Sequence, residues 1–306
     1  MKAKYWRTEA LGDQPERTWN EAVVKYLQET EHKASREKDI QMLRWLDQHF
    51  RDKLLSQITR TEVQRVATIK CQEKLVGRRP FKDGDPPPEH GTVKTTEKAT
   101  VNRYLALVRA ILNKAEGEWE WITRSPKITL FKEPTRRIRW LTQDEAARLI
   151  GALPPHLASM ARFSLATGLR ETNVTQLEWS QTDMQRKMAW IHPDQSKVKK
   201  ALAIPLNTTA IEILRNQVGQ HPRFVFTFRG SPVLRANNSA WRNGLKKAGI
   251  EDFRWHDLRH TWASWHVQNG TPLNVLQELG GWESVEMVRR YAHLGGQHLA
   301  KYAELV

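Results

Sequence analysis

The chain has 306 residues, enough for two domains, and its 39% hydrophobic and 27% charged residues are typical of a soluble globular protein. Its 49 Lys and Arg against 34 Asp and Glu leave a net charge of +15, which favours a polyanionic partner such as nucleic acid. The single cysteine excludes an internal disulfide and a cysteine-based metal cluster. Neither a secretion signal nor an apolar run of about 18 residues is visible, so we expect no membrane partner and a cytoplasmic location.

Four apolar stripes at helical spacing predict a small helical bundle over residues 17–122, preceded by an N-terminal extension, 1–16. Two of the helices begin at Thr-x-x-Glu patterns, Thr18 to Glu21 and Thr59 to Glu62. The other two helices carry apolar residues on one face: Ile40, Leu43 and Leu46 in one, and Val101, Leu105, Val108 and Leu112 in the other. The proline-rich stretch 77–91 predicts a loop.

Residues 123–139 hold two prolines and many basic side chains without periodicity, which predicts a basic interdomain linker suited to lie against phosphates. A capping box from Thr142 to Glu145 then begins a second domain, 140–306. Its patterns predict helices at 142–151, 156–167, 171–178, 207–218, 237–248, 257–268, 272–279 and 284–293.

The runs Met188–Ile191 and Ala201–Ile204 predict two strands of a hairpin with a long basic loop. The expected fold class is therefore mostly α with a small β-sheet. We expect an N-terminal helical bundle and a C-terminal mixed α/β domain.

The most distinctive polar cluster is His256-Asp-Leu-Arg259-His260. On a helix, His256, Arg259 and His260 would project from one side. Two histidines four apart also occur in the zinc-protease pattern His-Glu-x-x-His, but Asp257 is shorter than the required glutamate, and a neighbouring arginine repels a divalent cation. A further alternative is a surface or core-edge helix whose histidines only form hydrogen bonds.

Five elements, in chain order, resemble the motifs of the tyrosine recombinase (phage integrase) family. These are Ala166-Thr-Gly-Leu-Arg170, Gln195-Ser-Lys197 in the predicted hairpin loop, His256-x-x-Arg259-His260, Leu279-Gly-Gly-Trp282 and Arg290-Tyr291-Ala-His293. Each element alone is common, but five in the right order are not. The resemblance covers residues from about 140 to the end of the chain, whereas the first domain matches the family only in size and position.

The resemblance implies a site-specific DNA recombinase that cleaves and rejoins double-stranded DNA through a 3′-phosphotyrosyl intermediate, with no cofactor and no metal. It implies that residues 17–122 form a DNA core-binding domain and that residues 140–306 form the catalytic domain. It also implies a homotetramer on DNA that is a monomer or weak oligomer when free, acting with accessory DNA-bending or directionality proteins. A type IB-like topoisomerase and a non-catalytic regulator on the same fold remain the alternatives.

The resemblance also implies a role for each site residue. Two of them, Arg170 and Arg259, would clamp the scissile phosphate with rigid, permanently charged forks. The other roles are phosphate donor and acid/base for His256, indole N–H donor and packing residue for Trp282, general acid for Lys197 and nucleophile for Tyr291. A phenol has a pKa near 10, so it needs a base or nearby positive charge before it attacks.

Simpler explanations stay open for three of these residues, and two positions depart from the family pattern. Arg170 could be no more than a helix cap, and Tyr291 could be a core tyrosine. Lys197 could be a solvated loop charge, and Lys199 and Lys200 compete with it for the proposed role. Asn173 stands where many family members have an acid three residues after the first arginine. Gly281 is one extra residue before Trp282, and we expect it to alter the turn there.

Overall fold

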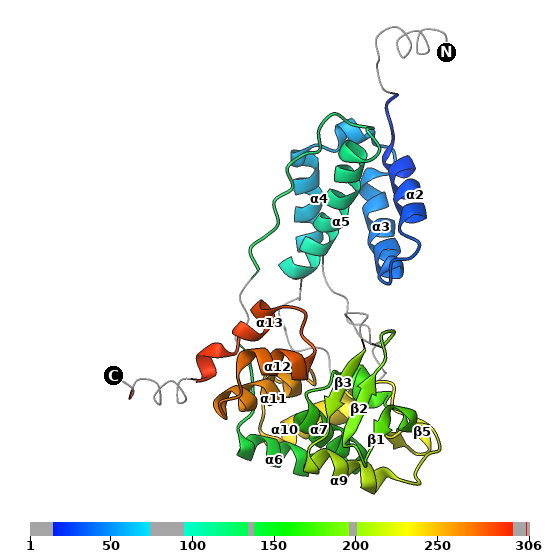
Figure 1. Cartoon of the computed structure of the whole chain (residues 1–306). Helices are drawn as coiled ribbons and strands as arrows, with labels where there is room; N and C mark the ends of the chain where they lie inside the picture. The colour runs from blue at the N-terminus through cyan, green and yellow to red at the C-terminus, as the bar shows by residue number, and fades with distance from the viewer. Residues whose placement is uncertain (1–14, 74–94, 134–137, 196–200, 296–303, 305–306) are drawn as a thin grey trace, which may run out of the picture. The chain divides into compact units, whose positions relative to one another are not determined.

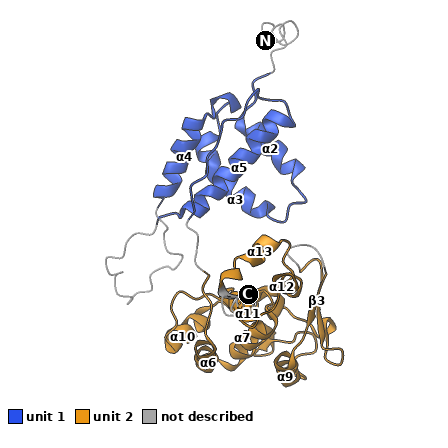
Figure 2. Cartoon of the chain, turned by 60° about the vertical axis from the view of Figure 1, so that its left-hand side comes forward, with its two compact units in different colours: residues 1–135 blue, residues 136–306 orange. Residues whose placement is uncertain are grey.

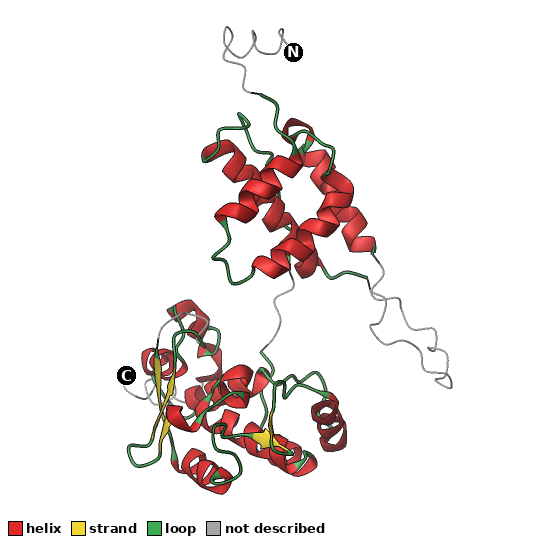
Figure 3. Ribbon diagram, turned by 90° about the vertical axis from the view of Figure 1, so that its right-hand side faces the viewer, coloured by secondary structure: helices red, strands yellow, loops and turns green. Residues whose placement is uncertain are grey.

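The computed structural model describes residues 15–73, 95–133, 138–195, 201–295 and 304 (Figure 1). The chain divides into two compact units, Met1–Thr135 and Arg136–Val306 (Figure 2). Helices dominate both units, and the named strands of the described residues all belong to the second unit (Figure 3). The predicted fold class, mostly α with a small sheet, is confirmed. Within the described ranges, no helix is long and apolar enough to cross a membrane.

The first unit is a bundle in which one long helix packs against three others. Its elements are α2 (Trp19–Glu29), α3 (Arg36–Phe50), η1 (Leu55–Gln57), α4 (Arg60–Gln72) and the long α5 (Lys98–Gly117). The hydroxyls of Thr18 and Thr59 accept the backbone N–H groups of Glu21 and Glu62, as the Thr-x-x-Glu patterns predict. All four predicted helices are therefore confirmed, whereas the predicted loop 77–91 lies outside the described residues.

The segment predicted to be an interdomain linker packs in its first part against the bundle. Ile128 is buried in the core of the first unit. The Asn102 amide donates to the carbonyl oxygen of Phe131 (2.9 Å), and the Phe131 N–H donates to Asn102 Oδ1 (2.8 Å). Residues 134–137 lie outside the described residues. The sequence did not predict this packing, because its few apolar residues have no helical or strand period.

The second unit surrounds its own apolar core with eight α-helices among the described residues. These are α6 (Gln143–Ala152), α7 (Pro155–Thr167), α8 (Glu171–Thr175), α9 (Thr208–Gln217), α10 (Ser239–Ala248), α11 (Asp257–Gln268), α12 (Leu273–Gly280) and α13 (Val285–Arg289). Two 3-10 turns, η2 (Trp179–Gln181) and η3 (Ala292–Gly295), complete its helical elements. The last predicted helix, 284–293, is too long: α13 ends at Arg289, and the Tyr291 N–H bonds to the Val288 carbonyl in a tight turn.

A small antiparallel sheet holds the predicted hairpin. It has the order β1 (Thr182–Asp183), β2 (Met188–Ile191), β3 (Leu202–Pro205), with Ile191 opposite Leu202. The predicted pairing of the two longer strands is confirmed. Strand β1 and the hairpin β4 (Thr227–Phe228) with β5 (Ser231–Pro232) were not predicted, because two residues are too few to show an alternating pattern.

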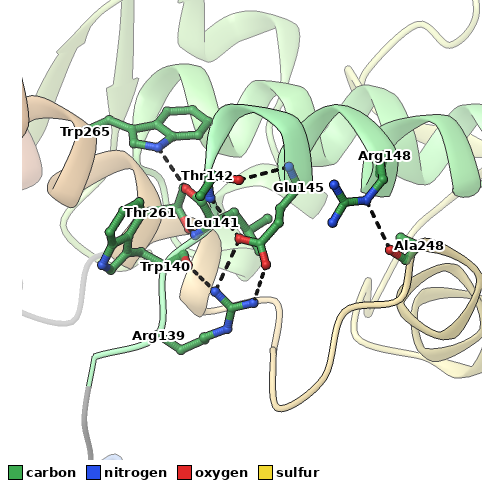
Figure 4. Close-up of polar contacts among 9 residues, drawn as sticks. All are labelled: Arg139, Trp140, Leu141, Thr142, Glu145, Arg148, Ala248, Thr261 and Trp265. Carbon is green, nitrogen blue, oxygen red and sulfur yellow. Dashed lines mark hydrogen bonds and ion pairs between the residues drawn. The ribbon is translucent and has the colours of Figure 1, made fainter.

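Helix α11 is held by the segment that leads into α6 (Figure 4). The Leu141 N–H donates to Thr261 Oγ1 (3.1 Å), and Trp265 Nε1–H donates to the Leu141 carbonyl (2.9 Å). Arg139 donates to the Glu145 carboxylate (2.7 Å), which itself belongs to the predicted capping box of α6. Helix α11 also packs against α7 and α12, so it is held from several sides.

Candidate active site

Arg259 on α11 joins three of the sequence motifs through its buried guanidinium group. Only 4% of the residue is exposed, and its Nη1 and Nη2 donate to the carbonyl oxygens of Gly168 (2.6 Å) and Gly280 (2.5 Å). Its charged carbon lies 4.2 Å from the centre of the Trp282 ring, at cation–π distance. One side chain therefore fixes the end of α7, the end of α12 and the indole that follows α12.

The glycines at these helix ends allow this close packing. Gly168 ends α7 in the left-handed region (φ 66°), and a Cβ atom there would lie 2.3 Å from the Trp262 ring. Gly281 ends α12 with φ 60°, so the extra residue before Trp282 makes a left-handed helix cap. After this cap, Trp282 packs beside Arg259.

Arg170 is half-buried at the N-cap position of α8, with an extended backbone. Its neighbour Gly168 is bonded to Arg259, so the two arginines come together although 89 positions separate them in the sequence. Burial lowers the pKa of the Arg170 guanidinium. Burial and the charge of Arg170 lower the pKa of Arg259 to about 9, which leaves it protonated at neutral pH. Because the two guanidinium groups repel each other, an anion bound between them would be stabilised by both positive charges.

A cavity of about 310 Å³ collects most of the site residues predicted from the sequence. Its lining consists of Arg170, His256, Arg259, His260, Trp282, Glu283, Met287, Arg290 and Tyr291. Five of the six predicted site residues thus meet in one place. The sixth, Lys197, lies outside the described residues.

The two histidines of the cluster lie edge to face at the start of α11. His256 occupies the N-cap position and is exposed, whereas His260, one turn later, is half-buried. Their ring centres are 5.1 Å apart, with an interplanar angle of 87°. Among the residues with described placement, no three His, Cys, Asp or Glu side chains gather as metal ligands.

Tyr291 is 1% exposed and points its hydroxyl at His260, with Oη 2.5 Å from Nδ1. Its ring belongs to a small apolar cluster with Trp262, Leu276 and Val288. The ring is therefore packed like that of a core tyrosine, and Tyr291 also belongs to the lining of the cavity.

Burial changes the acidity of both partners in this contact. It raises the pKa of Tyr291 to about 12, despite the lowering effect of Arg290 and Arg259. It lowers the pKa of His260 to about 4, and the charges of His256, Arg290 and Arg259 act in the same direction. At neutral pH the phenol is therefore protonated and the imidazole is neutral. Sequence reasoning placed His260 in the cluster but assigned it no role, because its partner lies 31 positions further along the chain.

Asn173, the departure from the family's acidic residue, is buried and holds the base of the predicted hairpin loop. Its side-chain amide donates to the carbonyl oxygen of Gln195 (3.1 Å). The Gln195 side chain in turn accepts from Gln181 Nε2 (2.6 Å), which also donates to the Trp190 carbonyl. A carboxylate could not donate to Gln195, so the amide serves here as a hydrogen-bond donor.

Comparisons with known proteins show the family of this chain and proteins of similar fold. The model of the phage integrase family matches residues 139–298, and the integrase of Salmonella phage P22 is 44% identical over 100% of this chain and 84% of that protein. The chain belongs to the phage integrase family. In fold, it is similar to a lambda integrase dimer bound to a COC′ core site, with TM-score 0.69, 16% identity and coverage of 95% of this chain and 85% of that one. A lambda integrase tetramer bound to a Holliday junction is similar too, with TM-score 0.69, 17% identity and coverage of 93% and 80%.

As a phage integrase family member, the chain is a site-specific DNA recombinase of the tyrosine recombinase type. The family match spans the whole of the cavity described above, from Arg170 to Tyr291. The similarity to the P22 integrase extends over the first unit as well, where the sequence resemblance rested only on size and position. These relatives favour recombination over the topoisomerase and regulator alternatives.

Proposed function

We propose that Tyr291 is the nucleophile with which this recombinase cleaves one strand of double-stranded DNA. Its Oη attacks the scissile phosphorus, an Oη–P bond forms, and the bond from phosphorus to the 5′ oxygen breaks. The product is a 3′-phosphotyrosyl link and a free 5′-hydroxyl. Attack by a 5′-hydroxyl on this link reverses the step, so that rejoining needs no external energy source. Exchange of strands between two cleaved sites then gives integration, excision or resolution.

The observation that supports this proposal best is the convergence of five predicted side chains on one cavity. Negative charge develops on the phosphate oxygens during the attack, and fixed donors stabilise it best. A guanidinium has N–H donors in excess of the two that Arg259 gives to Gly168 and Gly280, so Arg259 can still face a phosphate. Arg170 supplies the second fork, and His256 at the exposed rim supplies a donor and acid/base group.

Two further roles complete the proposed site. Trp282 covers Arg259 and contacts the ring of Tyr291, with ring centres 5.9 Å apart, so it packs the nucleophile and the clamp together. We assign the protonation of the departing 5′ oxygen to Lys197, in the loop that follows Gln195. The support for Lys197 is the family motif together with the anchoring of Gln195 by Asn173.

We also propose that the DNA-bound form is a homotetramer. Among the structures of similar fold, a lambda integrase dimer is bound to a core site and a lambda integrase tetramer is bound to a Holliday junction. The net charge of +15 suits a double-stranded DNA partner. In this proposal residues 17–122 are the core-binding domain and residues 140–306 the catalytic domain, and accessory DNA-bending or directionality proteins assist. The P22 relative is itself an integrase, which favours integration and excision as the task.

A nicked suicide substrate tests the nucleophile directly. Because the fragment beyond the nick diffuses away after cleavage, the covalent protein–DNA adduct accumulates and migrates as one band on a denaturing gel. We expect the wild-type chain to form this adduct and Tyr291→Phe to form none, while binding the same DNA. Tyr104→Phe, in the helical first unit, is the matched control and should form the adduct at the wild-type rate. An adduct on Tyr291→Phe would refute the assignment.

A further inference from the structure

We propose that His260 is the general base of DNA cleavage, with Nδ1 taking the phenolic proton as Tyr291 Oη attacks the phosphorus. This inference rests on the proposed function, in which Tyr291 is the nucleophile. It adds a catalytic residue to the site, because His260 is not among the six residues assigned from the sequence.

The geometry carries the inference. His260 Nδ1 lies 2.5 Å from Tyr291 Oη, and the two ring centres are 5.8 Å apart with an interplanar angle of 45°. A general base must lie within hydrogen-bond reach of the proton that it removes, and this one does. Tyr291 is only 1% exposed, so bulk water has little access to its hydroxyl. The proton therefore needs an acceptor inside the protein, and the imidazole provides one.

The surroundings keep that acceptor free of a proton before DNA binds. His256 and Arg259 lie on the same helix, Arg290 and Tyr291 follow α13, and the cavity lining adds Arg170 and Glu283. The arginines of this set are cationic, so together with burial they disfavour a second positive charge on His260. In this proposal the neutral imidazole carries its proton on Nε2, so that Nδ1 is the lone-pair acceptor of the Tyr291 O–H.

DNA itself would strengthen the base at the moment when it is needed. A phosphodiester in the cavity brings a negative charge next to the imidazole, and an opposite charge favours the protonated form. The transfer is concerted with Oη–P bond formation, because a free phenolate beside an imidazolium is disfavoured before attack. The electron pair of the broken bond leaves on the 5′ oxygen, which takes its proton from the general acid.

The reverse step uses the same residue in the opposite sense. During rejoining, a 5′-hydroxyl attacks the phosphotyrosyl phosphorus, gives its proton back to the group that was the general acid of cleavage, and the tyrosine oxygen departs. The His260 imidazolium then returns the proton from Nδ1 to Oη. His260 is thus the base of cleavage and the acid of rejoining, and its loss should slow both directions.

His260→Asn tests this role, because the asparagine amide can still form a hydrogen bond with Oη but cannot take its proton. We expect single-turnover cleavage of the suicide substrate at neutral pH to fall by about 10²–10⁴-fold. In the variant, only the ionised phenol attacks, so its rate should rise about tenfold per pH unit between about pH 6 and pH 9. The wild-type rate should be nearly independent of pH there, because the His260 imidazole is already neutral.

A matched control separates chemistry from packing. His266 lies on the same helix, is half-buried and contacts Thr271 Oγ1 (3.0 Å), so His266→Asn is an equal change away from the cavity. It should keep the wild-type pH profile. DNA affinity and thermal unfolding, measured for both variants, show whether each is folded. Replacing Tyr291 with a fluorinated tyrosine of lower pKa should restore most of the cleavage rate of His260→Asn, because this phenol needs less help from a base. It should restore little of a rate that was lost because the tyrosine is misplaced.

Two outcomes would overturn the inference. One is a folded, DNA-binding His260→Asn variant that cleaves at the wild-type rate with the wild-type pH profile. The other is a slow variant whose rate neither rises with pH nor recovers with the fluorinated tyrosine, since that would indicate a positioning effect. A covalent adduct on Tyr291→Phe would refute Tyr291 as the nucleophile, and with it the proposed function. The two outcomes above refute only the role of His260, so the two failures are distinguishable.

Discussion

At the scale of single residues, Arg259 combines a structural task with the chemical one that we propose. Its guanidinium holds the carbonyls of Gly168 and Gly280, and these two glycines end different helices. A buried carbonyl that loses its donor costs about 1–3 kcal/mol. The proposed phosphate clamp therefore also supports the cavity walls, and these bonds fix its position without DNA.

We expect Arg259→Lys to fail in both tasks, because a lysine ammonium has no planar fork with which to reach both carbonyls. The variant should unfold with a free energy lower by about 1–3 kcal/mol and should cleave the suicide substrate at least about 100-fold more slowly. Thermal unfolding and adduct formation are the two measurements. Arg254→Lys, an exposed position just before α11, is the control and should change neither. Unchanged thermal stability of Arg259→Lys would contradict the structural task.

Asn173 illustrates how one atom changes a residue's part in the site. Asn173 stands where many family members have an acid, and an amide cannot offset positive charge. In the structure this amide donates to the Gln195 carbonyl instead, next to the loop of Lys197. We expect Asn173→Asp to slow cleavage by about tenfold or more, because a carboxylate would face a carbonyl oxygen with no donor between them. An unchanged single-turnover rate would show that this anchor is dispensable.

At the scale of elements, short local signals determine where helices begin. Thr142 accepts the Glu145 N–H (3.2 Å), and the Glu145 carboxylate accepts the Thr142 N–H (2.9 Å), which is the reciprocal capping box expected from the sequence. Glu145 also pairs with Arg139, and Leu141 between them is bonded to Thr261 on α11 (Figure 4). The start of α6 and helix α11 are therefore joined through one short segment.

We expect Thr142→Ala to lower the free energy of unfolding by about 1 kcal/mol, because Ala cannot accept the Glu145 N–H. Calorimetry of the full chain should show the loss in the transition of the second unit. Thr208→Ala, at an exposed position in α9, is the matched control and should have a smaller effect. Equal melting temperatures for the two variants would refute a contribution of the capping box.

At the scale of the whole molecule, the net charge of +15 predicts that DNA affinity depends strongly on salt concentration. Contacts between basic side chains and phosphates release counterions, so we expect DNA affinity to fall by about 10³-fold or more when salt rises from about 50 to 200 mM. Fluorescence anisotropy with a labelled duplex at several salt concentrations measures the slope. A duplex of unrelated sequence is the control and should show a similar slope at lower affinity. A slope near zero would contradict a binding mode dominated by phosphate contacts.

The sequence by itself determined the fold class, nearly all the helices and the motifs that carry family membership. Caps, apolar stripes and short motifs are local signals, and they can be identified within a few neighbouring residues, as at Thr18, Thr142 and Arg170. Elements of two residues, such as β1 and β4, and the packing of Phe131 on Asn102 have no such local signal.

Only the tertiary structure decided which side chains meet. Arg259 reaches a carbonyl 91 positions away, and the Tyr291 hydroxyl meets an imidazole 31 positions away. Contacts of this kind depend on how α7, α11 and α12 pack, and no periodic pattern along a single chain encodes the partner's identity. For the same reason the acidity of Tyr291 and His260 became visible only in the folded site, where burial and converging charges change the pKa of each group.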